Sequence, residues 1–437
     1  MYYAADMSDE LFDDVARQAE GGPDLDGEAR LETANRTQVE LTPTDLESLL
    51  PPGHAARLVW RFVEGLDLSA FTVSIRSREG RAGRPAIDPK ILVALWLYAT
   101  IDGVGSAREV DRLCYAHDAY RWLRGGVSVN YHTLSTFRVA HQAALDNLLT
   151  QSITVLLDKQ VVTLHRIAQD GTKIRASAGV RSFRRGERLR DCRQMARQQV
   201  ARTKAEADGA APVARAAAQR RAADERLARV EEALAALPEV EAAKQRNRTK
   251  SAARVSTTDP DARVMKMADG GYRPAYNVQF ATDVDGHAVV GVAVTNGGEH
   301  AQLVPMLDQV QARTRRRPGA VFADGGFVST AGIVAVAARG VPLYAPVPED
   351  KHAPGSGAGP MDPAVAAWRA RMATDEAKTL YRLRAATAER VNADTKGHRA
   401  LRTVPVRGLP KVHTWALWVA LAVNTLRAME IVPHLMT

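Results

Sequence analysis

Two aspartates follow strand-like segments and stand where carboxylates can do chemistry. Asp170 follows "VVTLHRIAQ" and precedes the turn-forming Gly171, so the strand is expected to end there. Asp324 follows "AVFA" and precedes two glycines. Sites in open α/β sheets form at strand ends, and two carboxylates there can hold a hard divalent cation such as Mg²⁺. Taken singly, each aspartate could instead be a turn former or a cap.

A third carboxylate lies in the segment "YRLRAATAERVNADTKGHRALR". On a helix, at about 100° per residue, four suitable side chains share an arc of roughly 140°: Tyr381, Arg384, Glu389 and Lys396. Glu389 would complete the ligands of two metal ions roughly 3.5–4 Å apart, an arrangement that activates water in phosphodiester chemistry. Arg384 and Lys396 would bind phosphate, and Tyr381 would bind a phosphate or stack on a base. The alternative is a charged face exposed to solvent.

These residues need a sheet to position them. The runs "AYNVQFATD" and "HAVVGVAVTN" are separated by "VDG", which is typical of a hairpin. Strands and helices then alternate through "GAVFADGGF", "STAGIVAVAARG" and "VPLYAPV". This order predicts an α/β fold, with a mixed sheet and helices on its faces. The apolar segment 412–426, with Trp415 and Trp418, is too short to span a bilayer comfortably and predicts a buried helix.

The region before the sheet predicts an all-α N-terminal domain over residues 42–155. Asp88 is a candidate N-cap, followed by Pro89 at the first helical position. The segment "NYHTLSTFR" could open the recognition helix of a helix-turn-helix, which would direct His132, Thr133, Ser135 and Arg138 to DNA. The alternative is a surface helix of a structural bundle. Residues 1–41 are acidic, lack the apolar stretch of a signal peptide and are expected to be disordered.

The positive charge of the chain is concentrated in residues 181–254. This low-complexity segment has 19 Lys and Arg and 10 Asp and Glu, a net charge of +9, which equals the +9 of the whole chain. A basic excess suggests a polyanionic partner. Leu227, Val230, Leu234 and Leu237 predict a helical hairpin or short coiled coil inserted into the catalytic region. The insertion could bind phosphates, contact a second protomer, or serve solubility alone.

Several stretches together resemble the insertion-sequence DDE transposases of bacteria, whose catalytic domain has an RNase H-like (retroviral-integrase-like) fold. Residues 83–126 and "NYHTLSTFR" resemble their helical N-terminal domain, and "AQDGTKIRASAG" resembles the block around their first aspartate. "TTDPDARVMKMADGGYRPAYNVQFATD" resembles the return to the sheet, and "VTNGGEHAQLVPMLD" with "FADGGFVS" resembles the second-aspartate block. "YRLRAATAERVNADTKGHRALR" resembles their Tyr-Arg-Glu-Lys signature. The likeness covers most of residues 45–430.

The resemblance implies a metal-binding triad of Asp170, Asp324 and Glu389, with Tyr381, Arg384 and Lys396 as the accessory residues of the signature. One spacing departs from the family pattern, because four residues instead of three separate Arg384 from Glu389. Arg382 therefore stays open as the alternative match. Lys173 could meet the phosphate or be a plain surface lysine. The implied domains are a tail (1–41), a helical DNA-binding domain (42–155), and a catalytic domain (156–437) containing the insertion.

The implied function is a transposase that hydrolyses phosphodiesters at the ends of its element and joins the freed 3′-OH to target DNA, using two Mg²⁺ or Mn²⁺ ions. Its partners would be double-stranded DNA, at the inverted repeats and the target, and further copies of itself in a homodimer or higher oligomer. No membrane partner is expected. Two cysteines without metal-ligand spacing, Cys114 and Cys192, fit a reducing cytoplasm, where the protein would associate with the nucleoid. The alternatives are a catalytically inactive DNA-binding regulator and a metal-dependent nuclease without strand transfer.

Overall fold

The computed structural model describes Thr37 and residues 45–73, 75, 77, 80, 84–206, 213–249, 251–299, 301–348 and 361–431. The chain divides into two units, Met1–Thr44 and Asp45–Thr437. The acidic segment 1–41, for which we expect disorder, lies outside the described residues except for Thr37. Everything below concerns the second unit.

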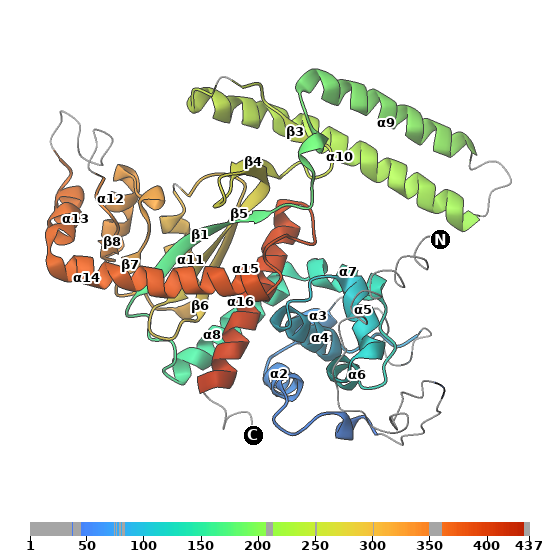
Figure 1. Cartoon of the computed structure of the whole chain (residues 1–437), viewed down its shortest axis with the longest axis horizontal. Coiled ribbons are helices and arrows are strands. Elements are labelled where there is room, and N and C mark those ends of the chain that lie inside the picture. Colours follow the sequence, from blue (N-terminus) through green and yellow to red (C-terminus); the bar gives the residue numbers. More distant parts are fainter. Residues whose placement is uncertain are drawn as a thin grey trace, which may run out of the picture. The chain divides into compact units, whose positions relative to one another are not determined.

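The first part of this unit is helical, as expected (Figure 1). Its helical elements are η1 (Glu47–Leu49), α2 (Ala55–Glu64), α3 (Ser69–Thr72), α4 (Pro89–Ile101), α5 (Ala107–Ala116), α6 (Asp118–Arg124), α7 (Tyr131–Ala140) and α8 (Gln142–Asp158). The carboxylate of Asp88 accepts a hydrogen bond from the backbone N–H of Lys90, which confirms the predicted cap of α4. Helix α4 is buried along almost its whole length, so it forms the centre of this bundle.

The second part contains a mixed sheet. Its strands are β1 (Ile167–Arg175), β4 (Arg263–Lys266), β5 (Tyr272–Asp283), β6 (Val289–Thr295), β7 (Val321–Phe322) and β8 (Leu343–Tyr344). The sheet runs β4-β5-β1-β7-β8, and β6 also pairs with β5. Strand β1 is antiparallel to β5 and parallel to β7, and β7 is parallel to β8. The predicted hairpin of β5 and β6 and the predicted mixed α/β sheet are both confirmed.

Helices follow and cover the sheet. They are α11 (Leu303–Thr314), α12 (Thr330–Ala338), α13 (Pro363–Ala373), α14 (Asp375–Arg384), α15 (Arg390–His398) and α16 (Leu409–Ile431). A short turn η3 (Gly325–Phe327) follows β7, and a π-helical turn η4 (Ala385–Glu389) joins α14 to α15. Thus one long helical stretch, from α14 through α15, carries all four residues of the predicted signature, Tyr381, Arg384, Glu389 and Lys396.

Helix α16 links the helical bundle to the sheet. It packs against α4 and α8 and also against β6. Trp415 and Trp418 are completely buried, which confirms the prediction that this apolar segment is a core helix. Within the described part of the chain, no helix is long and apolar enough to cross a membrane. Because one hydrophobic core runs through both regions, the division into domains near residue 155 stays a prediction.

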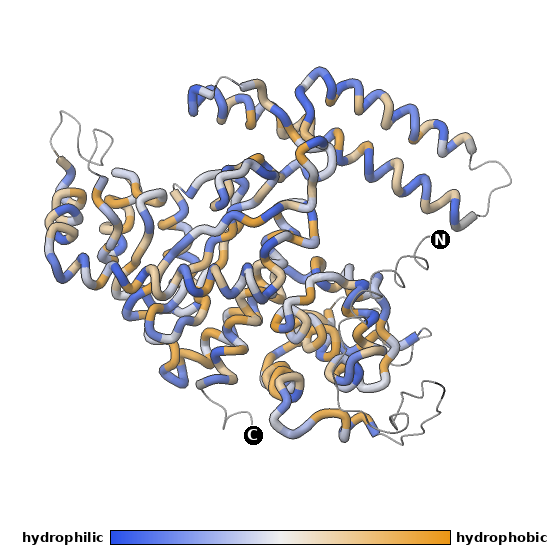
Figure 2. The backbone as a smooth tube through the Cα atoms, in the orientation of Figure 1, coloured by the Kyte–Doolittle hydropathy of each residue, from blue (hydrophilic) through white to orange (hydrophobic). Residues whose placement is uncertain are grey.

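The basic insertion is a helical hairpin, as predicted. Helices α9 (Gly186–Glu206) and α10 (Val213–Arg246) pack side by side (Figure 1). At its base, β2 (Phe183–Arg184) pairs with β3 (Val255–Ser256), just after the turn η2 (Val180–Ser182). A small core of its own holds it together, formed by Leu189, Ala233, Leu237, Val240 and Val255. Figure 2 shows that the two helices are otherwise mostly hydrophilic, in contrast to α4 and α16.

Candidate active site

Asp170 on β1 and Asp324, two residues after the neighbouring strand β7, lie close to each other. Strands β1 and β7 pair in parallel through Ile167↔Val321 and Ala168↔Phe322. Asp170 and Asp324 each lie two residues beyond the second of these pairs, so the same register sets them opposite each other. Opposite residues of parallel strands point to the same face of a sheet. The fold therefore brings together the two carboxylates that the sequence singled out.

Asp170 does not end its strand, in contrast to our expectation. Strand β1 continues through Gly171 to Arg175 and pairs with β5 over its full length. Gly171 is therefore no turn residue. A Cβ atom at this position would collide with the carboxylate of Glu299 and with the side chain of Asn277, so the close approach of these side chains explains the glycine. Asp324, by contrast, follows the end of β7 as predicted.

Asp170 is held by hydrogen bonds and by one nearby cation. Its side chain is 13% exposed. One carboxylate oxygen, Oδ1, accepts from the backbone N–H of Gly171 at 3.0 Å and lies 3.5 Å from Nη1 of Arg384, and Oδ2 accepts from Nδ2 of Asn392 at 2.9 Å. Burial raises the pKa of Asp170 to about 6, against the opposing effect of Arg384, and the charges of Asp324 and Glu299 raise it further.

The helix α14–η4–α15 faces this pair of aspartates. Its π-helical turn packs against β1 and β5. Burial raises the pKa of Tyr381 and lowers the pKa of Lys396, and the charge of Asp170 acts on both groups. Arg384 also senses the charges of Asp170 and Asp324. The structure thus places Tyr381, Arg384 and Lys396 near Asp170, whereas Glu389 is exposed and contacts Arg384.

The π-helical turn accounts for the unusual spacing of the signature segment. A π-turn bonds residue i to residue i+5 and so accommodates one extra residue in a helix. The fifth residue after Arg384 is Glu389, and Nη2 of Arg384 lies 3.4 Å from Oε1 of Glu389. Arg384 is 15% exposed and stacks over the ring of Tyr381 at 5.7 Å. Arg382 is exposed. The geometry therefore favours Arg384 over Arg382 as the arginine of the site.

The carboxylate donors suit a hard divalent cation, because Mg²⁺ and Mn²⁺ prefer oxygen ligands. The buried charge of Asp170, with Asp324 beside it, also requires a nearby cation, and Arg384 supplies that charge here. Glu389 is 61% exposed and is bound by the same guanidinium. In the residues that the structure describes, no three acidic, His or Cys side chains already converge as a metal site.

Two other predicted DNA contacts lie apart from this centre. Lys173 is exposed and lies three positions after Asp170 on the same strand. Because successive side chains of a strand alternate between faces, Lys173 points to the face opposite Asp170. His132 is exposed on α7, where its ring lies 4.0 Å from that of Tyr131. Its role in DNA binding stays a prediction.

The prediction that Arg138 faces DNA is wrong. Arg138 is only 6% exposed. Its guanidinium lies over the rings of Trp96 and Trp415, at 5.1 and 5.8 Å, and donates a hydrogen bond to the carbonyl of Gly105. The side chain is therefore part of the core between α4, α7 and α16, where cation–π contacts and a backbone acceptor replace its hydration.

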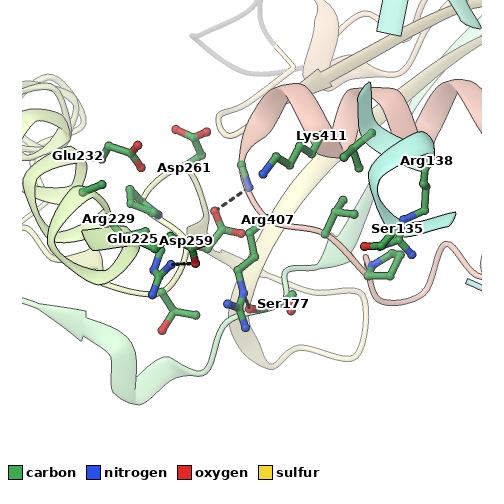
Figure 3. A pocket seen from close by; sticks show the side chains of 17 residues that line it. Ser135, Arg138, Ser177, Glu225, Arg229, Glu232, Asp259, Asp261, Arg407 and Lys411 are labelled. Atoms are coloured by element: carbon green, nitrogen blue, oxygen red, sulfur yellow. Dashed lines mark hydrogen bonds and ion pairs between the residues drawn. The ribbon is translucent and has the colours of Figure 1, made fainter. Parts of the chain in front are cut away.

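Arg138 and Ser135 also border a cavity of about 600 Å³ between α7, α10 and the start of α16 (Figure 3). Its charged lining is mixed and includes Arg229, Arg407 and Lys411 together with Glu225, Glu232, Asp259 and Asp261. Asp259 is fully buried and accepts hydrogen bonds from the hydroxyl of Tyr276 and the N–H of Gly408. None of the three triad carboxylates lines this cavity.

Two site residues escaped the sequence argument. Asn392 lies three residues after Glu389, one helical turn away, so a helical projection of the signature segment places it in the same arc. Glu299 lies in the loop after β6 and accepts a hydrogen bond from Asn277 at 3.1 Å. No sequence signal pointed to Glu299, because its proximity to Gly171 and Gly326 depends on how that loop folds over β1.

A strand β1 between antiparallel β5 and parallel β7, with facing carboxylates and a covering helix that carries a third, defines an RNase H-like DDE domain. Comparison with protein families agrees. Residues 245–425 match the transposase DDE domain, and residues 44–140 match a transposase domain, DUF772. Asp324 and Glu389 lie inside the first match, whereas Asp170 lies between the two. No curated protein and no solved structure gives a significant match.

The two matches follow each other in the order typical of transposases from insertion sequences, and together they cover more than half of the chain. The chain therefore belongs to the DDE transposases, enzymes of DNA transposition. This confirms the resemblance, the expected fold class and the expected enzyme class.

Proposed function

We propose that the protein cuts the ends of a mobile DNA element and joins them to target DNA, with Asp170, Asp324 and Glu389 as its metal-binding triad. Transposases with a DDE domain generally use a divalent metal. The observation that supports the assignment is the parallel pairing of β1 with β7, which leaves Asp170 on β1 close enough to Asp324, just after β7, for the charge of Asp324 to raise the pKa of Asp170, with the helix that bears Glu389 packed against β1. Mg²⁺ or Mn²⁺ would be held there as two ions, which would neutralise phosphate charge and activate the attacking oxygen.

The chemistry has two balanced steps. In the first, water attacks the phosphorus at the element end and the bond to the 3′ oxygen breaks, leaving a 3′-OH. In the second, this 3′ oxygen attacks a target phosphorus and displaces the 3′ oxygen of the target strand. The protein has to position the phosphate and neutralise its charge. Arg384 and Lys396 would supply the positive charge for this task, and the hydroxyl of Tyr381 would bind the same phosphate.

Glu389 would have to exchange its present partner for a metal ion. In this structure, Arg384 bridges Asp170 and Glu389. The guanidinium would turn to the DNA phosphate once metal balances the carboxylates, since Arg binds phosphate through a planar fork of donors. The proposal further includes binding of double-stranded inverted repeats and target DNA, in part by α7 with His132. It also includes a homodimer or higher oligomer, because an element has two ends, and action on nucleoid DNA in the cytoplasm.

A cleavage and joining assay tests the proposal. The wild-type chain is incubated with a duplex that carries the terminal repeat, a target plasmid, and Mg²⁺ or EDTA. We expect Mg²⁺-dependent nicking at the repeat and joined products. Nicking without joining would favour a nuclease. Binding of the repeat without any cleavage would favour an inactive regulator.

A further inference from the structure

The positive charge of the insertion is concentrated at the base of the hairpin and on α9. Residues 181–206 contain nine Lys and Arg and three Asp and Glu, whereas α10 contains seven and six. Residues 247–254 add three basic residues and no acidic one. The long arm α10 is therefore almost neutral, α9 carries a net charge of +3, and residues 181–185 and 247–254 at the base each add a further +3.

Three exposed arginines lie at this base, and we name them the base arginines: Arg184, Arg185 and Arg254. In the β2–β3 ladder, Phe183 pairs with Ser256 and Arg184 with Val255. Because the two strands are antiparallel, Arg185, which follows Arg184, and Arg254, which precedes Val255, lie at the same end of the two-stranded sheet. Like charges on adjoining strands destabilise a sheet, and no ion pair offsets the base arginines within the described part of the chain.

The base arginines are carried by a rigid support. Phe183 and Val255 are buried, and the hydroxyls of Ser182 and Ser256 lie 2.7 Å apart in a hydrogen bond. The backbone N–H of Thr257 also donates to the carbonyl of Ser182 at 3.1 Å. Charges held on such a support lose less entropy on binding than charges on mobile arms.

The base also follows directly from the catalytic strand. Strand β1 continues five residues from Asp170 to Arg175, roughly 17 Å at the usual strand rise, and β2 begins eight residues later. We propose that the base arginines are a docking surface for the phosphate backbone of double-stranded DNA engaged by the active site. This rests on the proposed function and names the part of the insertion that grips the DNA. A surface for a second copy of the chain is the competing outcome.

The salt dependence of DNA binding tests this surface. The base variant carries Arg184→Gln, Arg185→Gln and Arg254→Gln. The control variant makes the same charge change on the arm, as Arg215→Gln, Arg220→Gln and Arg221→Gln, all exposed on α10. The full-length chain, the two variants and a short linear duplex are used, and the dissociation constant is measured across a salt series.

Each lost phosphate contact lowers the salt slope by about 0.9. For the base variant, we expect the slope of log affinity against log salt concentration to be smaller by about 2 to 3. Raising the salt from about 50 to about 200 mM would then weaken its DNA binding roughly 40-fold less than it weakens the binding of the wild type. The control should lose less than about 1 in slope. Equal losses in the two variants, or an unchanged slope in the base variant, would overturn the proposal, as would loss of a dimer by light scattering at unchanged slope. Failure of the wild type to bind DNA would instead refute the proposed function itself.

A stability measurement excludes a folding defect. Replacing adjoining like charges should leave the melting temperature of the base variant unchanged or slightly raised at low salt. A base variant that melts well below wild type would show that the base arginines support the hairpin, and it would overturn their assignment as a binding surface.

Discussion

Replacing Asp170 by Asn should stabilise the metal-free protein while abolishing its activity. Asp170 is mostly buried beside Asp324 and Glu299, and burial raises its pKa from 3.8 to about 6. The folded protein therefore works against the ionised form of this carboxylate at neutral pH. Asn has nearly the same shape and carries no charge, and its one amide oxygen can accept the hydrogen bond from Asn392, although its NH2 group cannot accept from the backbone N–H of Gly171 or face Arg384 favourably. The substitution removes the unfavourable charge and with it the proposed metal ligand.

The raised pKa gives the magnitude. Each pKa unit corresponds to 1.36 kcal/mol, so the shift to about 6 costs the folded state about 3 kcal/mol at neutral pH. The sign follows from proton linkage: between pH 3.8 and about 6 the folded state binds more protons than the unfolded state, so stability falls as pH rises through this window. Asp170→Asn should lack this decline. The loss of the contact with Arg384 reduces the gain by up to about 1 kcal/mol.

Chemical unfolding in EDTA at pH 5 and pH 7.5 measures the effect. We expect the difference in free energy of unfolding between Asp170→Asn and wild type to grow by about 1.5 kcal/mol between these pH values. About half of the pH-dependent destabilisation of the wild type falls in that interval. Added Mg²⁺ or Mn²⁺ should stabilise the wild type and leave the variant unchanged. Asp158→Asn, at an aspartate that is 75% exposed, is the matched control and should show neither effect.

The opposite outcome would refute the reasoning. A variant that is less stable than wild type at pH 7.5, or whose advantage does not change with pH, would show that Asp170 is an ordinary structural carboxylate satisfied by Arg384 and Asn392. Equal stabilisation of variant and wild type by Mg²⁺ would place the metal elsewhere.

Two further substitutions and one deletion test individual parts of this interpretation. Asn392→Ala removes a hydrogen bond to the Asp170 carboxylate, worth about 1.5 kcal/mol or more; Mn²⁺ titration should show roughly ten-fold weaker binding, and unchanged affinity would contradict a positioning role. Deletion of Ala386 should convert the π-turn to an α-turn and keep Glu389 beside Arg384, with cleavage retained within about ten-fold, whereas complete loss in a folded variant would contradict our explanation of the spacing. Arg138→Ala should lower the free energy of unfolding by roughly 2–4 kcal/mol and leave the DNA affinity of the folded protein unchanged; weakened DNA binding at unchanged stability would restore a role at the surface.

The fold followed from the sequence where local patterns and tertiary packing agree. The cap at Asp88, the β5–β6 hairpin and the buried segment around Trp415 each have a local signal that the core reinforces. The joint placement of Asp170 and Asp324 also followed, although Asp170 lies within β1 and not at its end, because β1 and β7 are adjacent parallel strands.

The remaining errors come from non-local contacts. Arginine is normally exposed, so the sequence pattern predicted that Arg138 faces solvent and DNA. The sequence does not show that Trp96 and Trp415 pack over its guanidinium. Gly171 looked like a turn signal because sequence does not show that Glu299 folds against β1. The sequence also showed no sign of the π-turn. In an ideal helix with 3.6 residues per turn, Arg384 and Glu389 lie at opposite edges of the shared arc, whereas the π-turn brings their side chains into contact.

The most direct test of the triad is cleavage by the Asp324→Asn variant, measured with binding of the element end in the same preparation. The account predicts that the variant binds the terminal repeat with nearly wild-type affinity and produces no Mg²⁺-dependent nick, while Asp158→Asn cleaves normally. Cleavage at a rate near wild type, or loss of binding together with cleavage in a folded variant, would contradict the assignment of Asp324 to the metal site.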